Sequence, residues 1–151
     1  MTSKIHLAAD TRCHPIARIT SAGHRHDSLA FEPVMTAIKI RRRHGGRPQT
    51  RPGRVLADKA YSNRAIRAHL RKRRITATIP EPADQQAHRQ RRGRPPAFDA
   101  EAYKKRNAVE RAINKLKAFR AVATRYDKRD YVFRGAVDVA SIRIWLRDPV
   151  P

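Results

Sequence analysis

The N-terminal segment alternates between apolar and polar residues. In Lys4–Ala9, Ile5 and Leu7 share one side with the final alanine, and this period of two is typical of a half-buried strand. Asp10 and its two successors provide a turn, after which Cys13–Thr20 returns as a second strand. We therefore predict an antiparallel hairpin at the start of the chain.

A short apolar run, Val55–Ala57, ends in Asp58. Such a run between turn residues is typical of a buried central strand. A helix capped by Ser62 and a strand over Ile75–Ile79 follow, which predicts a parallel strand–helix–strand unit and an α/β domain. Asp58 would then stand where ligands bind on open sheets. The helix places Ala65, Ile66 and Leu70 inward and Arg64, Arg67, Arg71 and Arg74 outward.

Apolar residues at helical spacing predict three further helices. The first starts near Glu32 and is capped by Asp27 or Ser28, the second runs from an Asp99 cap to Arg120, and the third spans about 130–147. Their apolar faces are Phe31, Val34, Met35 and Ile38; Val109, Ala112, Ile113, Leu116 and Phe119; and Phe133, Val137, Ala140 and Ile144. Trp145 is interpreted as a core or interface residue.

The second of these helices also carries an ordered polar row. At about 100° per residue, Tyr103, Arg106, Glu110 and Lys117 fall within an arc of roughly 60°. The row therefore holds one carboxylate among cations, a pattern that a solvated basic face also explains.

Charge narrows the choice of partner. The chain of 151 residues has 35 Lys and Arg against 13 Asp and Glu, a formal net charge of +22. This length suits one domain, and so large an excess predicts a polyanion as partner, most often nucleic acid. A lone cysteine, Cys13, excludes an internal disulfide and a cysteine-rich zinc site. With no apolar signal core and no uninterrupted apolar span, we expect a cytoplasmic protein associated with the nucleoid.

Two basic loops, at about 39–54 and 83–98, interrupt the predicted elements. The first carries Arg41, Arg42 and Arg43 among glycines and prolines, with no acid. Because arginine forks onto phosphate oxygens, this loop is predicted to contact the DNA backbone rather than to serve as a solvated linker.

The spacing Tyr103-x2-Arg106-x3-Glu110-x6-Lys117 resembles the signature of bacterial insertion-sequence transposases of the DDE type, in the group of families four and five. Leu56–Tyr61 resembles the segment with that family's second catalytic aspartate, and the likeness runs over nearly the whole chain. The resemblance implies an RNase H-like mixed sheet flanked by helices, with Mg²⁺- or Mn²⁺-dependent DNA cleavage and strand transfer. Transposon ends, as double-stranded DNA, are the implied partner.

Residue by residue, the resemblance implies that Asp58 and Glu110 are catalytic metal ligands. Phosphodiester chemistry of this kind uses two metals about 4 Å apart, held by carboxylates. Lys59 follows Asp58 in this chain, and a lysine follows the second catalytic aspartate in the family. Lys117 is similar to the position that contacts DNA beside the scissile end, and Arg106 would stabilise phosphate charge or orient Glu110. Tyr103 completes the signature, and Arg125 adds a further DNA contact.

The family's first aspartate lies upstream of the segment that resembles Lys4–Asp10, whereas this chain starts at Met1. We therefore expect the N-terminal strand to be missing and the chain to be inactive alone. Asp10 is the nearest candidate to replace the first aspartate, but its position is typical of a turn residue. An open sheet edge would favour a self-dimer or pairing with an N-terminal transposase segment.

Two alternatives stay open at this point. A non-catalytic basic DNA-binding remnant would bind with steep salt dependence and ignore Mg²⁺. A structural RNA-associated protein would prefer RNA. A separate metal site at His24, His26 and Asp27 has only weak support from the sequence.

Overall fold

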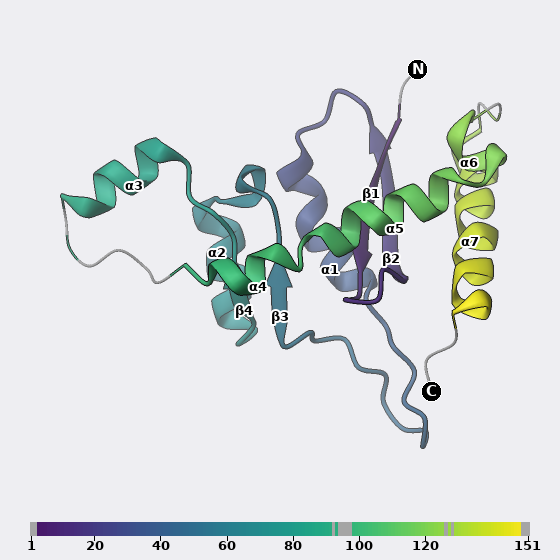
Figure 1. Cartoon of the computed structure of the whole chain (residues 1–151), viewed down its shortest axis with the longest axis horizontal. Helices are drawn as coiled ribbons and strands as arrows, with labels where there is room; N and C mark the ends of the chain where they lie inside the picture. The colour runs from purple at the N-terminus through teal and green to yellow at the C-terminus, as the bar shows by residue number, and fades with distance from the viewer. Residues whose placement is uncertain (1–2, 92, 94–97, 126, 128, 149–151) are drawn as a thin grey trace.

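The computed structural model describes residues 3–91, 93, 98–125, 127 and 129–148, and its elements lie on both sides of a hairpin (Figure 1). In chain order the elements are β1 (Ser3–Ala9), β2 (Pro15–Ala22), η1 (Asp27–Ala30), α1 (Phe31–Ala37), β3 (Arg54–Leu56), η2 (Lys59–Tyr61), α2 (Arg64–Lys72), β4 (Thr76–Thr78), α3 (Ala83–Gln90), α4 (Ala100–Lys104), α5 (Asn107–Lys117), α6 (Arg120–Ala123) and α7 (Asp130–Arg147), where η marks a 3₁₀ helix.

The predicted hairpin is confirmed, and both of its faces are covered. Strands β1 and β2 pair antiparallel, with Ala8 opposite Ala17 and Leu7 opposite Arg18. The alternating side chains therefore divide between two helical layers. Helix α1 covers one face, and α5 and α7 cover the other (Figure 1).

The α1 side has a core built from several segments. The predicted apolar face of α1 is confirmed, since Phe31, Val34, Met35 and Ile38 are all buried. They meet buried side chains of β2, of α2 and of the segments that flank β4, namely Ala17, Ile66, Leu70, Ile75 and Ile79. This side of the hairpin is therefore held to the strand–helix–strand unit by apolar contact.

The α7 side combines an apolar core with polar ties. The predicted bounds and buried face of α7 are confirmed, and Phe133, Val137, Ala140 and Ile144 pack with Leu116 and Val122. Around this core, Arg18 bonds both oxygens of Asp138, and Thr20 donates to Asp130 at 3.0 Å. Trp145, half-buried, donates its indole N–H to Pro15 O at 2.8 Å. Directional bonds thus fix α7 along β2.

Helix α7 also carries a second apolar stripe, which faces away from the core. Val132, Val139, Ile142 and Leu146 are exposed large hydrophobic residues, the last at 75%. Together with Gly135 they recur at steps of three and four residues, the spacing of a coiled-coil seam. The helix is therefore apolar on two opposite sides.

The parallel strand–helix–strand unit is confirmed, because β3 and β4 pair parallel around α2. Three details differ from the prediction. The strand β3 is half-buried and has one partner rather than being central. Asn63, not Ser62, caps α2 by accepting from Ile66 N at 2.8 Å, since Ser62 ends η2. Ala65 is exposed.

The described strands form two sheets of two strands each, one antiparallel and one parallel. The α/β class is confirmed, but the strands do not join into the one mixed sheet that we predicted. Helices cover both faces of the hairpin. The RNase H-like topology stays a prediction.

Helix α3 corrects the second predicted loop, at 83–98. Residues Ala83–Gln90 are helical, although this stretch has no apolar stripe. Its Ala and Gln content favours a helix, Asp84 lies in the first turn, and Pro82 immediately precedes it. Of the predicted loop arginines, Arg92 and Arg94 lie outside the described residues. In Figure 1, α3 projects from the end of the molecule opposite α7.

Within the described part of the chain, no helix combines the length and apolarity needed to cross a membrane.

Candidate active site

Asp58 stands just beyond β3, as its position after an apolar run predicts. Its Oδ1 accepts the backbone N–H of Lys59 at 2.6 Å, so the carboxylate caps η2. Asp58 and Lys59 are both exposed. The strand end and the 3₁₀ turn together fix where the second carboxylate oxygen is presented.

Glu110 lies in the first turn of α5. The helix is anchored by Ala108, Ala112 and Leu116, which are buried against the hairpin and α7. Since glutamate side chains are favoured at the positive end of a helix, the location is locally favourable. The Glu110 side chain is 54% exposed and therefore accessible to a ligand.

Arg106 lies between the two carboxylates. Both of its terminal nitrogens donate to Glu110 Oε1 at 2.7 Å, and one of them lies 3.9 Å from Asp58 Oδ2. Its guanidinium carbon is also 5.7 Å from the centre of the Tyr103 ring. The structure thus brings together four of the predicted site residues, from segments far apart in the sequence.

A break in the helix makes this arrangement. We predicted one continuous helix, but α4 ends at Lys104 and α5 starts at Asn107. Between them, Arg106 N bonds Tyr103 O at 2.9 Å and Val109 N bonds Arg106 O at 3.1 Å, the i to i−3 bonds of a tightened turn. From this turn Arg106 contacts Glu110, four residues further along the chain, and Asp58 of the segment after β3.

A second ion pair joins the same two segments. Asp99 caps α4, as predicted, by accepting from Ala102 N at 2.9 Å, and it also pairs with Arg54 Nη1 at 2.5 Å. The Ala102 N–H and the Arg54 guanidinium both lower the pKa of the Asp99 carboxyl. Arg54, predicted to belong to the DNA-binding loop, is exposed at the start of β3 and is paired with Asp99.

The other predicted DNA contacts lie outside this cluster. Lys117 ends α5 and is exposed, about 10.5 Å along the helix from Glu110 at 1.5 Å per residue. Arg41, Arg42 and Arg43 are exposed in the 39–54 loop. The loop is closed by paired bonds between Ile40 and Gln49, at 2.9 and 2.8 Å.

Arg125 has partners within the fold. Its guanidinium lies 4.7 Å from the centre of the Phe133 ring and donates to Ser3 Oγ at 2.7 Å. These contacts tie the segment before α7 to β1. A DNA contact by Arg125 stays a prediction, and it would compete with this packing.

Asp10 acts as the predicted turn residue. Its carboxylate accepts from the backbone N–H groups of Arg12 and His14, at 2.9 and 2.8 Å, and contacts the His14 ring at 3.0 Å. Its partners are thus residues of the hairpin turn. The structure places no contact between Asp10 and either Asp58 or Glu110 among the described interactions.

His26 and Asp27 have local roles. His26, rather than Asp27 or Ser28, caps η1 by accepting from Ser28 N, because its backbone is extended there. Asp27 pairs with Lys4 at 2.9 Å, and this bond lowers the pKa of Asp27. Within the described residues, no group of three or more His, Cys, Asp or Glu side chains could hold a metal ion.

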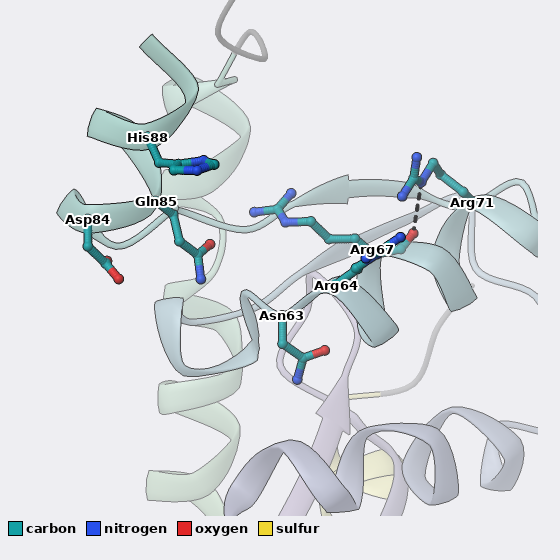
Figure 2. Close-up of a pocket in the computed structure, with 7 residues that line it drawn as sticks. All are labelled: Asn63, Arg64, Arg67, Arg71, Asp84, Gln85 and His88. Carbon is teal, nitrogen blue, oxygen red and sulfur yellow. Dashed lines mark hydrogen bonds between the residues drawn. The ribbon is translucent and has the colours of Figure 1, made fainter. Parts of the chain in front are cut away.

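The sequence prediction missed a groove between α2 and α3. Its lining combines arginines of α2 with polar residues of α3 (Figure 2). The outward row of arginines on α2 was visible in the sequence. The opposing wall was not, because α3 was predicted to be a loop.

Taken together, two exposed carboxylates flank a guanidinium on a strongly basic α/β chain. Two carboxylates can bind a cation, and the surrounding positive charge attracts a polyanion. The matching family model is described as "Transposase DDE domain" and covers residues 1–142. The chain therefore belongs to the DDE transposases of insertion sequences.

One relative extends this assignment along the whole chain. A Brucella ovis protein named "Putative transposase for insertion sequence element IS6501" is 30% identical over 148 residues, which is 97% of this chain and 100% of the relative. No solved structure matches.

Proposed function

We propose that Asp58 and Glu110 are the metal-binding carboxylates of a DNA strand-transfer site. The observation that carries this proposal is the position of Arg106, which contacts both carboxylates and so indicates that a cation is already accommodated between them. Two half-exposed carboxylates fit Mg²⁺ or Mn²⁺ in charge and ligand type. When bound, such ions activate a nucleophile and stabilise the leaving oxygen of a phosphodiester.

The surrounding residues have complementary roles in this proposal. Arg106 orients Glu110 and compensates phosphate charge when DNA is bound. Lys59 and Lys117 contact the DNA backbone on either side of the carboxylates. The Arg106 guanidinium lies over the Tyr103 ring, which stabilises its position. The exposed arginines 41–43 provide sequence-independent affinity for double-stranded DNA.

We further propose that this chain alone does not complete the reaction. The described residues bring two carboxylates together, whereas the DDE site uses three. A third carboxylate, supplied by an N-terminal transposase segment or by a second copy of the chain, would complete the set of ligands. The RNase H-like sheet would be completed in the same way.

Calorimetric titration of the purified chain with Mn²⁺ tests the metal site. We expect binding by the original chain and loss of binding in both Asp58→Asn and Glu110→Gln, because each removes one charged ligand. Asp10→Asn is the matched control, since Asp10 lies in the hairpin turn and should leave binding unchanged. Binding that survives both site substitutions, or a folded original chain that does not bind, would overturn the assignment.

A non-catalytic DNA-binding remnant is the second candidate function. It is favoured by the same Arg106 contact, which compensates part of the charge of the two carboxylates without any metal. DNA affinity separates the two: a remnant binds duplex DNA equally with and without Mn²⁺. An intact site binds more tightly with Mn²⁺, and Glu110→Gln removes that increase.

A further inference from the structure

The groove between α2 and α3 lies apart from the carboxylate pair. It has a volume of about 570 Å³ and opens to solvent. In Figure 2 the His88 ring and the Gln85 amide point from α3 toward the arginines of α2. The lining residues are Asn63, Arg64, Arg67, Arg71, Asp84, Gln85 and His88.

Helix α2 turns its arginines into this groove for a simple reason. Ile66 and Leu70 are buried at 3% and 1% exposure, so the opposite side of the helix faces outward. Arg64 and Arg71 are seven residues apart and therefore on the same side, about 10.5 Å from each other along the axis. Both are exposed at the groove.

The two walls are fixed relative to each other. Arg67 donates to Ser62 Oγ and to Ile79 O, each at 2.9 Å, and lies 3.5 Å from Glu81. Gln85 of α3 donates to Ser62 O at 3.2 Å and accepts from Ser62 Oγ at 3.3 Å. These bonds hold α3 against the start of α2, so the groove is preformed at this end.

The charges of the groove select its ligand. Three arginines and a histidine line it against one acid, Asp84. Guanidinium groups fork onto phosphate oxygens, and an axial span of about 10.5 Å covers about three 3.4 Å steps of one DNA strand. A single small anion would leave most of the volume empty.

The groove is also close enough to the carboxylate pair to share one DNA molecule. Asn63 follows Asp58 by five residues, so their Cα atoms are separated by at most about 19 Å. We propose that the groove binds the phosphate backbone of double-stranded DNA that extends from the Asp58–Glu110 site. This inference rests on the proposed function, and it adds a second contact surface to it.

Salt dependence of DNA binding tests the proposal. We compare Arg64→Gln/Arg71→Gln with Lys72→Gln/Arg147→Gln, which removes the same charge from exposed positions that do not line the groove. Arg67 is left intact because its bonds hold the walls. For a 20-base-pair duplex, two lost phosphate contacts should reduce the slope of log affinity against log salt by about 1.8 and weaken binding about thirtyfold near 0.15 M salt. The control pair should keep the original slope.

Equal slopes and affinities for the two double variants would overturn the groove as a DNA site. Substitution of arginines 41–43 together separates this failure from failure of the proposed function. If that triple variant still weakens binding, DNA binding survives and only the groove assignment is wrong. If the original chain binds no duplex at all, the proposed function itself fails.

A second measurement does not depend on affinity. The only cysteine of the sequence, Cys13, is buried, so a cysteine introduced at His88 can be labelled selectively with an iron chelate. We expect hydroxyl-radical cleavage of bound duplex DNA beside this position, as from a matched Lys117→Cys label. Cleavage from Lys117→Cys with none from His88→Cys would place the DNA elsewhere.

Discussion

The two carboxylates of the site stand on parts of the molecule that are built differently. Glu110 belongs to an 11-residue helix that packs against the hairpin and near an 18-residue helix. Asp58 follows a three-residue strand with one partner and caps a three-residue 3₁₀ helix. Glu110 is therefore positioned by extensive packing, and Asp58 by a short segment.

Because of this difference, the alignment of Asp58 with Glu110 depends on polar contacts. Arg106 meets Asp58 and Glu110, and Arg54 meets Asp99, so two ion pairs join the short segment to the helical side. Exposed ion pairs contribute little to stability because water and salt screen them. Asp58 should therefore shift more easily than Glu110, and a ligand that binds both would fix their separation.

The largest effects should come from the two cores. Phe133→Ala on the α7 side and Leu70→Ala on the α1 side should lower the free energy of unfolding by about 3–5 and 2–5 kcal/mol, because both side chains are almost fully buried. Urea denaturation measures the loss. Hydrogen exchange then tests the comparison, since a milder Leu70 variant such as Leu70→Val should speed exchange in β3 and leave α5 unchanged. Equal acceleration in both segments would mean that the two sides unfold as one.

Arg106→Ala should change metal affinity next most strongly. The substitution removes the cation that contacts both carboxylates, so Mn²⁺ no longer competes with it. We expect affinity to rise about tenfold, equivalent to about 1.4 kcal/mol. Arg111→Ala, an exposed arginine of the same helix, is the matched control. A fall in affinity would instead show that alignment of the carboxylates by Arg106 outweighs its competition with the metal.

A smaller effect should follow from loosening α7 on the hairpin. Arg18 bonds both oxygens of Asp138, with side chains 18% and 54% exposed. A double-mutant cycle with Arg18→Gln and Asp138→Asn should give a coupling of up to about 1 kcal/mol. A coupling near zero would leave the apolar core as the main support of the Glu110 side.

The smallest effect concerns pH on the α1 face of the hairpin. Burial lowers the pKa of His6 below its ordinary value of 6.5, and its ring bonds Ser21 Oγ at 2.8 Å. A lowered histidine pKa stabilises the fold above the unfolded value, and this stability is lost as pH falls through the folded value. The unfolding free energy should therefore decline below about pH 6.5, and His6→Gln should flatten the decline. An unchanged profile would assign the decline to other groups.

The regular elements were predictable from the sequence because their patterns are local. The hairpin alternates with a period of two, and α7 repeats its buried residues every three or four positions along its full length. Helix α3 was missed because a polar helix has no apolar stripe to reveal it. The caps are Asn63 instead of Ser62, and His26 instead of Asp27 or Ser28. Their positions depend on where the preceding 3₁₀ turn or the extended backbone ends.

The residues of the candidate site could be named from the sequence, but their geometry could not. Resemblance to the transposases named Asp58, Glu110, Arg106 and Tyr103, and the structure brings these four together. The turn at 105–106 contains neither glycine nor proline, so no local signal marks it. Arg106, which lies in this turn, contacts both Glu110 and Asp58, and only the folded chain brings Asp58 to it.

The second apolar stripe of α7 has a practical consequence for handling the protein. At low ionic strength, the large positive charge keeps molecules apart, since the screening length is about 10 Å at 0.1 M salt. Purification of a basic protein often includes a high-salt wash, and at 1 M salt the screening length falls to about 3 Å. The exposed Val139, Ile142 and Leu146 side chains are then free to meet those of another molecule. Light scattering should therefore show association that increases with salt, and Ile142→Gln should suppress it.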